Sequence, residues 1–177
     1  MLEYPFFWSN LILMIVTFII VYYYSIKTYG LKTILIVNLV LSSFVLLIII
    51  TGSYSAADLR LPPYFKGNIG GTEFHLTDPI SIFPIFMIIL ELGRISWGKM
   101  KGDPLSNKDV IIMSIIVSIF GLCYQPIMDL TSAAVGYYYY QNPPVINIFG
   151  YPIWFLMSFG IYGLYALIFL MFEKSYS

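Results

Sequence analysis

Four long segments of this sequence contain no charged side chain, and that feature limits the fold more than any other. No Asp, Glu, Lys or Arg occurs between Tyr4 and Ile26, between Thr33 and Ile50, between Val110 and Met128, or between Tyr151 and Phe172. A helix needs roughly 20 apolar residues to cross the hydrocarbon of a bilayer. The runs are continuous rather than alternating, which favours helices over the strands of a barrel.

These runs predict an all-α fold, namely a polytopic transmembrane helical bundle. We expect about five spans, over residues 6–26, 33–50, 79–97, 110–128 and 151–172, with a polar loop over 51–78. A further short helix within 130–141 would raise the number of spans to six. The whole chain, 1–177, is expected to form a single integral-membrane domain, and association into a homo-oligomer is left open.

The basic residues are distributed unevenly between the two sides of such a bundle. One side holds most of them, namely Lys27, Lys32, Arg94, Lys99, Lys101, Lys108 and Lys174, whereas Arg60 and Lys66 lie on the other. Cytoplasmic loops of membrane proteins carry the excess of Lys and Arg. We therefore expect an integral protein of the cell membrane with its N-terminus outside and its C-terminus, including Glu173 and Lys174, in the cytoplasmic water.

The composition excludes several functional classes. Only 10% of the residues are charged, against about 25% in a typical soluble domain. The formal net charge is zero, so general attraction to nucleic acid is not indicated. The single Cys123 excludes an internal disulfide and a cysteine-based zinc site, and the single His75 argues against a histidine-based metal site. We expect no metal and no cofactor.

Small and polar residues recur along the fourth expected span, 110–128, and beyond it. They are Ser114, Ser118, Gly121, Gln125, Asp129, Ser132 and Gly136, separated by steps of three or four. This polar stripe lies on one face of a helix, and lipid would not tolerate that face, so it should look into the bundle. Pro126 should kink the helix. The stripe is either a tight packing seam or part of a site, and the small residues fit packing better than Gln125 and Asp129 do.

The third expected span, 79–97, contains two charges, Glu91 and Arg94, which lie three residues apart on one helical face. One interpretation is a self-neutralising pair near the cytoplasmic end, with Arg94 reaching toward the interface. The other is that Glu91 is a functional carboxylate inside the bundle. Glu91 belongs to the inner part of its span and Asp129 to the outer side, so we do not expect them to form one tight carboxylate pair.

A buried carboxylic acid suggests a chemistry for the polar stripe. Desolvation disfavours the charged carboxylate, so such an acid can keep its proton and deliver it to an alkene. Aromatic faces stabilise the resulting carbocation. Addition of water to the cation is the reaction of a hydratase, and attack by an internal double bond is the reaction of a cyclase. The catalytic candidates are Asp129, Gln125 and Glu91. The candidates for substrate contact are Tyr138, Tyr140 and Tyr151 with, from the polar loop, His75, Glu73 and Asp78.

The segment from about 125 to 164 resembles the C-terminal part of a known group of membrane enzymes. Asp129 is followed by Gly136 and four tyrosines, and then by Gly150–Tyr151–Pro152 before the last run. This order is similar to that of membrane carotenoid hydratases of the bisanhydrobacterioruberin hydratase type, and to integral-membrane lycopene and terpene cyclases. The resemblance implies that Asp129 is a catalytic or structural acid and that the tyrosines line a polyene pocket. Leu130 stands where those proteins often have proline.

Two functions therefore stay open. The first is a membrane enzyme acting on an isoprenoid or carotenoid-like lipid. The second is a non-catalytic multispanning protein, either a binder of lipid or of a small ligand or an assembly subunit, whose polar stripe only packs helices. A transporter is disfavoured because charges inside the runs are few and no inverted repeat is visible. The shape of the bundle around Asp129 should separate the first two.

Overall fold

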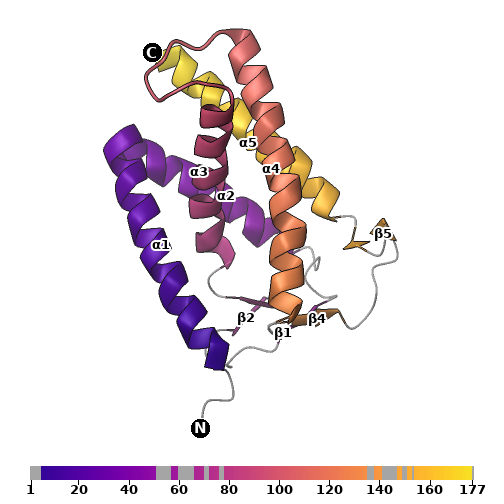
Figure 1. Ribbon diagram of the computed structural model, residues 1–177. Coiled ribbons are helices and arrows are strands. Elements are labelled where there is room, and N and C mark those ends of the chain that lie inside the picture. Colours follow the sequence, from indigo (N-terminus) through magenta and orange to yellow (C-terminus); the bar gives the residue numbers. More distant parts are fainter. Residues whose placement is uncertain are drawn as a thin grey trace. The chain divides into compact units, whose positions relative to one another are not determined.

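The computed structural model describes residues 5–50, 57–59, 66–69, 72–75, 78–134, 138–140, 147–148, 151–152 and 154–176. Five helices account for most of them (Figure 1). They are α1 (Pro5–Tyr29), α2 (Leu31–Ile50), α3 (Asp78–Ser96), α4 (Asn107–Ala134) and α5 (Trp154–Tyr176). Each helix overlaps one predicted span, and the largest difference is α4, which continues past the predicted end at 128.

Short strands lie in the segments that connect the helices. They are β1 (Ala57–Leu59), β2 (Lys66–Ile69), β3 (Thr72–His75), β4 (Tyr138–Tyr140), β5 (Asn147–Ile148) and β6 (Tyr151–Pro152). They form three antiparallel pairs, β1 with β4, β2 with β3, and β5 with β6. In the described part of 130–141, α4 ends and β4 begins, so the alternative of a further short helix there is wrong.

The helix boundaries follow from local chemistry. Gly30 has φ +84°, a left-handed conformation that glycine adopts without steric cost, and this separates α1 from α2. Ser106 precedes α4 and exchanges hydrogen bonds with Asp109, whose amide donates to Ser106 Oγ at 3.1 Å while Ser106 N donates to Asp109 Oδ2 at 2.9 Å. This reciprocal pair is a capping box that starts α4.

The chain divides into two compact units, which are described separately. The first contains residues 1–85 and 131–143, and the second contains 86–130 and 144–177. In the first unit α1 and α2 form a helical hairpin (Figure 1), and Ile34 and Leu41 on α2 are buried. The Tyr22 hydroxyl of α1 donates to Asn38 Oδ1 of α2 at 2.8 Å, which links the two helices.

The second unit has an apolar core between three helices. Its buried side chains come from α3, α4 and α5, and include Phe86, Leu90, Met113, Val117 and Leu170. The Phe86 ring meets the rings of Tyr165 and Phe169 edge-on, with centroids 6.3 and 6.2 Å apart. Such edge-to-face pairs add to the gain from burying the rings.

Two described helices contain stretches long and apolar enough to cross a membrane, Leu11–Tyr29 in α1 and Asn107–Tyr124 in α4. Only 6% of the first stretch and 33% of the second are buried. The expected helical fold is confirmed at this level, as a helical protein with two candidate membrane-crossing helices.

Candidate functional site

The first half of the polar stripe is fully used in packing and in hydrogen bonds within its own helix. Ser114 and Ser118 are buried, with 7% and 5% of their surface exposed. Ser114 Oγ donates to the carbonyl of Val110 at 2.7 Å, and Ser118 Oγ donates to the carbonyl of Ser114 at 2.9 Å. Both hydroxyl protons are thus used inside α4, and both side chains are buried.

Glycines allow α3, α4 and α5 to approach closely along this half of the stripe. A Cβ atom added to Gly121 would lie 2.7 Å from Tyr162 Cγ on α5, and one added to Gly93 on α3 would lie 2.6 Å from Val117 Cγ2. A Cβ at Gly163 of α5 would collide with the Ser118 side chain. The packing interpretation is therefore confirmed for Ser114, Ser118 and Gly121, which line a filled seam.

The second half of the stripe carries Gln125 and Asp129, the predicted acid and its neighbour. Both are helical residues of α4, which continues through Pro126 to Ala134. At about 100° per residue, both share the face of Ser118 and Gly121, while Ile127 lies across the helix and is 60% exposed. The side chains of Gln125 and Asp129 lie outside the described residues, so their role stays a prediction.

The tyrosines that come after α4 form a strand beside the polar loop. In β4, Tyr138 pairs with Leu59 of β1, and Tyr140 pairs with Ala57. Strand β1 also lies against β3 within the same unit, and β3 contains Glu73 and His75. The backbone therefore brings the tyrosine segment and the polar loop together, as the prediction of a shared site requires, although the side chains of these residues lie outside the described ones.

Two further predicted site residues have defined backbone positions. Asp78 is the first residue of α3, and Tyr151 is in β6, where it pairs with Ile148. Their side chains also lie outside the described residues, and their predicted contact with substrate is untested. Glu91 is half-buried on α3 and has an interaction of its own. Among the described residues, no group of three His, Cys, Asp or Glu side chains is arranged to hold a metal ion.

Arg94 departs from the expectation that it reaches out to the interface. Its residue exposure is 0%, and Nη2 donates to Glu173 Oε2 near the end of α5. The other carboxylate oxygen of Glu173 accepts a hydrogen bond from Lys101 Nζ at 2.8 Å. Glu173 was expected to lie in water, but only 9% of its side chain is exposed. Burial of these charges is tolerated because they are paired.

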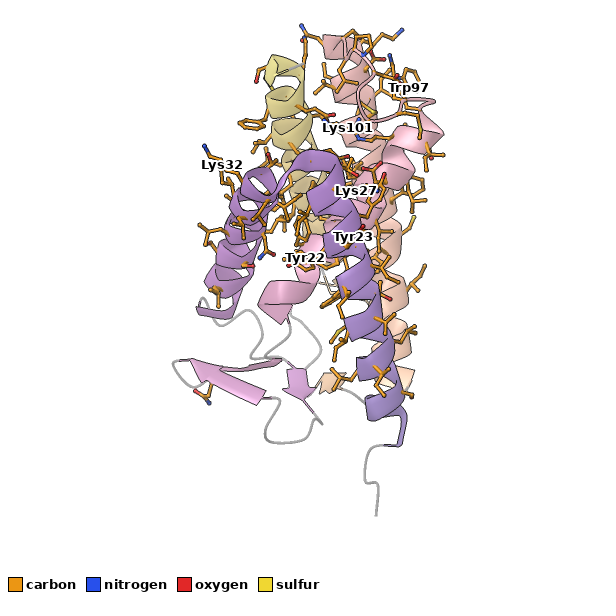
Figure 2. All side chains as sticks on the ribbon, turned by 90° about the vertical axis from the view of Figure 1, so that its left-hand side faces the viewer. Tyr22, Tyr23, Lys27, Lys32, Trp97 and Lys101 are labelled. Carbon is orange, nitrogen blue, oxygen red and sulfur yellow. The ribbon has the colours of Figure 1, made fainter. Side chains whose placement is uncertain are left out.

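Hydrogen bonds also organise the loop between α3 and α4, where Trp97 and Lys101 lie (Figure 2). Trp97 Nε1 donates to Asp109 Oδ1 at 2.8 Å, and Lys99 Nζ donates to the carbonyl of Pro104 at 3.2 Å. Lys174 of α5 donates to Asn107 Oδ1 at the start of α4. The loop end of the second unit is thus closed by polar contacts that join segments far apart in the sequence.

The sequence did not reveal which residues pair with Arg94 or which residues pack against the polar stripe. The pairing of Arg94 with Glu173 spans 79 residues, and no local spacing indicates it. The close approaches of Gly121 to Tyr162 and of Gly163 to Ser118 also join separate helices, and the glycines were the only local signal for them. The chain matches no protein-family model, no curated protein and no solved structure.

Proposed function

We propose that this protein is an integral-membrane enzyme that acts on an isoprenoid or carotenoid-like lipid, with Asp129 as the acid that protonates an alkene. The observation that carries the proposal is the pairing of β4 with β1, which joins the tyrosine segment after Asp129 to the polar loop. The order of Asp129, Gly136, the tyrosines and Gly150–Tyr151–Pro152 supports the same assignment through its resemblance to membrane carotenoid hydratases and cyclases.

Exposed apolar side chains occur on every helix, which supports insertion of all five helices into the membrane. The described examples include Ile19 on α1, Leu39 on α2, Ile95 on α3, Ile115 on α4 and Leu164 on α5, with between 49% and 66% of each residue exposed. Exposing such surface to water costs roughly 25 cal/mol per Å², whereas lipid removes that cost. In this arrangement all five helices span the cell membrane, with the N-terminus outside and the C-terminus in the cytoplasm.

The proposed step balances with one proton and one water. Asp129 transfers its proton to an alkene carbon, so a C–H bond forms from the π electrons and the adjacent carbon becomes cationic. Tyrosine faces stabilise that cation. A water molecule adds to the cation and returns a proton to the Asp129 carboxylate, which gives hydration; attack by a second double bond of the substrate, followed by loss of a proton, gives a ring.

The second candidate function is a non-catalytic membrane protein. It is favoured by the filled seam at Ser118, Gly121 and Tyr162, because a stripe that packs in its first half can continue to pack in its second half. Such a protein would bind a lipid or serve as an assembly subunit without changing its partner chemically.

One experiment separates the two functions. The wild type, Asp129→Asn and the control Asp103→Asn, a carboxylate in the loop before α4, are expressed in a host that makes polyenes, and the extracted lipids are compared by mass spectrometry. We expect a product heavier by one water, or an isomeric ring-closed product, in the wild type and in Asp103→Asn but not in Asp129→Asn. Identical lipids in all three strains and in an empty-vector strain, with each protein folded, would favour the non-catalytic function.

A further inference from the structure

The exposed face of α1 changes character along its length. Ile20 is 61% exposed, Tyr23 in the next turn is 69% exposed, and Lys27 in the turn after that is also exposed. Residues three and four apart lie on one helical face, and the step from Ile20 to Lys27 covers about 10 Å at 1.5 Å per residue. Aliphatic, aromatic and cationic side chains follow one another in this order where a helix passes from hydrocarbon into the headgroup layer.

Helix α2 shows the same order in reverse. Gly30 turns the chain between the two helices, and Lys32 at the start of α2 is exposed. Leu35 and Leu39 follow at steps of three and four, and they are 58% and 66% exposed. Figure 2 shows Lys27 and Lys32 at the end of the hairpin where α1 and α2 join. Each helix therefore has a lysine at this end and an exposed apolar face beside it.

The charge of this end is not balanced within the hairpin. Lys27 and Lys32 are the only charged side chains of α1 and α2, and among the described residues neither has a hydrogen bond or an ion pair. Lys27 lies in the last turn of α1, where a cation suits the helix dipole, but Lys32 lies in the first turn of α2, where a cation is unfavourable. Helix stability therefore does not explain Lys32.

We propose that the α1–α2 turn, formed by Tyr23, Lys27 and Lys32, binds the headgroups of anionic phospholipids. The phosphate oxygens accept hydrogen bonds from the two ammonium groups, and the acyl chains lie along the exposed apolar faces of α1 and α2. A zwitterionic lipid carries its own cation, which offsets its phosphate, so the two lysines select lipids with a net negative charge. This inference rests on the membrane insertion proposed for α1 and α2, and it does not depend on the reaction of Asp129.

The test measures which lipids the purified, immobilised full chain retains from neutral detergent micelles that contain equal amounts of phosphatidylglycerol and phosphatidylcholine. Bound lipids are extracted and counted by mass spectrometry. We expect the wild type to prefer phosphatidylglycerol, and the preference to weaken at high salt because both lysines are exposed. Lys27→Gln and Lys32→Gln should each lower the ratio of the two lipids about five-fold, the contribution of one lysine near an anionic surface. Equal retention of both lipids by the wild type would overturn the proposal.

Two control variants show whether the position of the charge matters. Exchanging both lysines for arginine keeps the two charges and should keep the preference. Lys108→Gln removes an exposed lysine from the first turn of α4, next to Asp109. It should change the ratio by less than about two-fold, because the neighbouring carboxylate offsets its attraction for anions. An equal loss in Lys108→Gln and Lys32→Gln would overturn the site, since total charge alone would then govern binding.

A further variant keeps this proposal separate from the proposed function. Asp129→Asn should lose the lipid product but keep the full preference for phosphatidylglycerol. If the wild type retains both lipids without preference, only the headgroup site fails. If it retains neither lipid, the insertion of α1 and α2 fails, and the headgroup site fails with it.

Discussion

The two halves of α4 carry the same periodic spacing but different residues at the repeated positions. From Asn107 to Gly121 the helix is capped, its serine hydroxyls are satisfied, and its glycine meets a tyrosine ring on α5. From Gln125 onward the stripe carries an amide and a carboxylate, and the chain then passes into a tyrosine strand paired with the polar loop. The comparison teaches that a polar face directed into a helical bundle is not by itself evidence of a site.

The largest difference between the halves should appear in activity. Asp129→Asn should lower product formation by roughly 10²- to 10⁴-fold, the usual contribution of a proton-transfer group. Ser118→Ala, in the first half, should leave it unchanged because Ser118 bonds only within α4. Lipid mass spectrometry in a polyene-producing host measures both. A matching loss in the two variants would mean that the stripe acts as one structural unit.

The next largest effect is expected in the free energy of unfolding, for residues where the loop between α3 and α4 meets the end of α5. Glu173→Ala leaves Arg94 buried without its partner and should lower the free energy of unfolding by about 3 to 5 kcal/mol. Combining Arg94→Met with Glu173→Leu should recover most of the loss, since an apolar pair of similar volume needs no counter-charge. Thermal unfolding in detergent reports both, with Asp103→Asn as the control for losing a carboxylate at the surface.

A smaller effect is expected within the seam. Gly121→Ala should destabilise the protein by about 1 to 3 kcal/mol, because its Cβ meets the Cγ and Cβ of Tyr162, which cannot move without the ring. Gly160→Ala is the matched control on α5, since a Cβ there meets nothing within 4 Å. The control should be neutral or stabilising by up to about 1 kcal/mol. If both variants unfold alike, the seam is looser than the structure indicates.

The smallest effect tests one contact of the seam by compensation. Gly163→Ala directs its new Cβ at the Ser118 hydroxyl, a small group that can rotate, so the loss should be about 1 kcal/mol or less. Adding Ser118→Ala removes the hydroxyl and should return the unfolding midpoint toward that of the wild type. Additive losses in the double variant would show that the two positions do not touch.

The helices were predictable because their signals are local. Uncharged runs predict spans over 6–26 and 33–50, which lie inside the observed helices Pro5–Tyr29 and Leu31–Ile50. The polar stripe predicts that the fourth helix continues past the end of the span at 128, and α4 does continue to Ala134. The strand at Tyr138–Tyr140 was missed because a short strand is stable only when a partner, here Ala57–Leu59, is paired with it.

The sequence alone was sufficient to predict helices whose surfaces are compatible with lipid. The length and the charge of an apolar run are properties of each segment taken separately. The sequence was also sufficient to single out the stripe that contains Ser118, Gly121 and Asp129. The assembled fold was needed to show that Ser118 and Gly121 of that stripe are packing positions. It was needed again to pair Arg94 with Glu173, since burial of a charge depends on groups that only folding brings together.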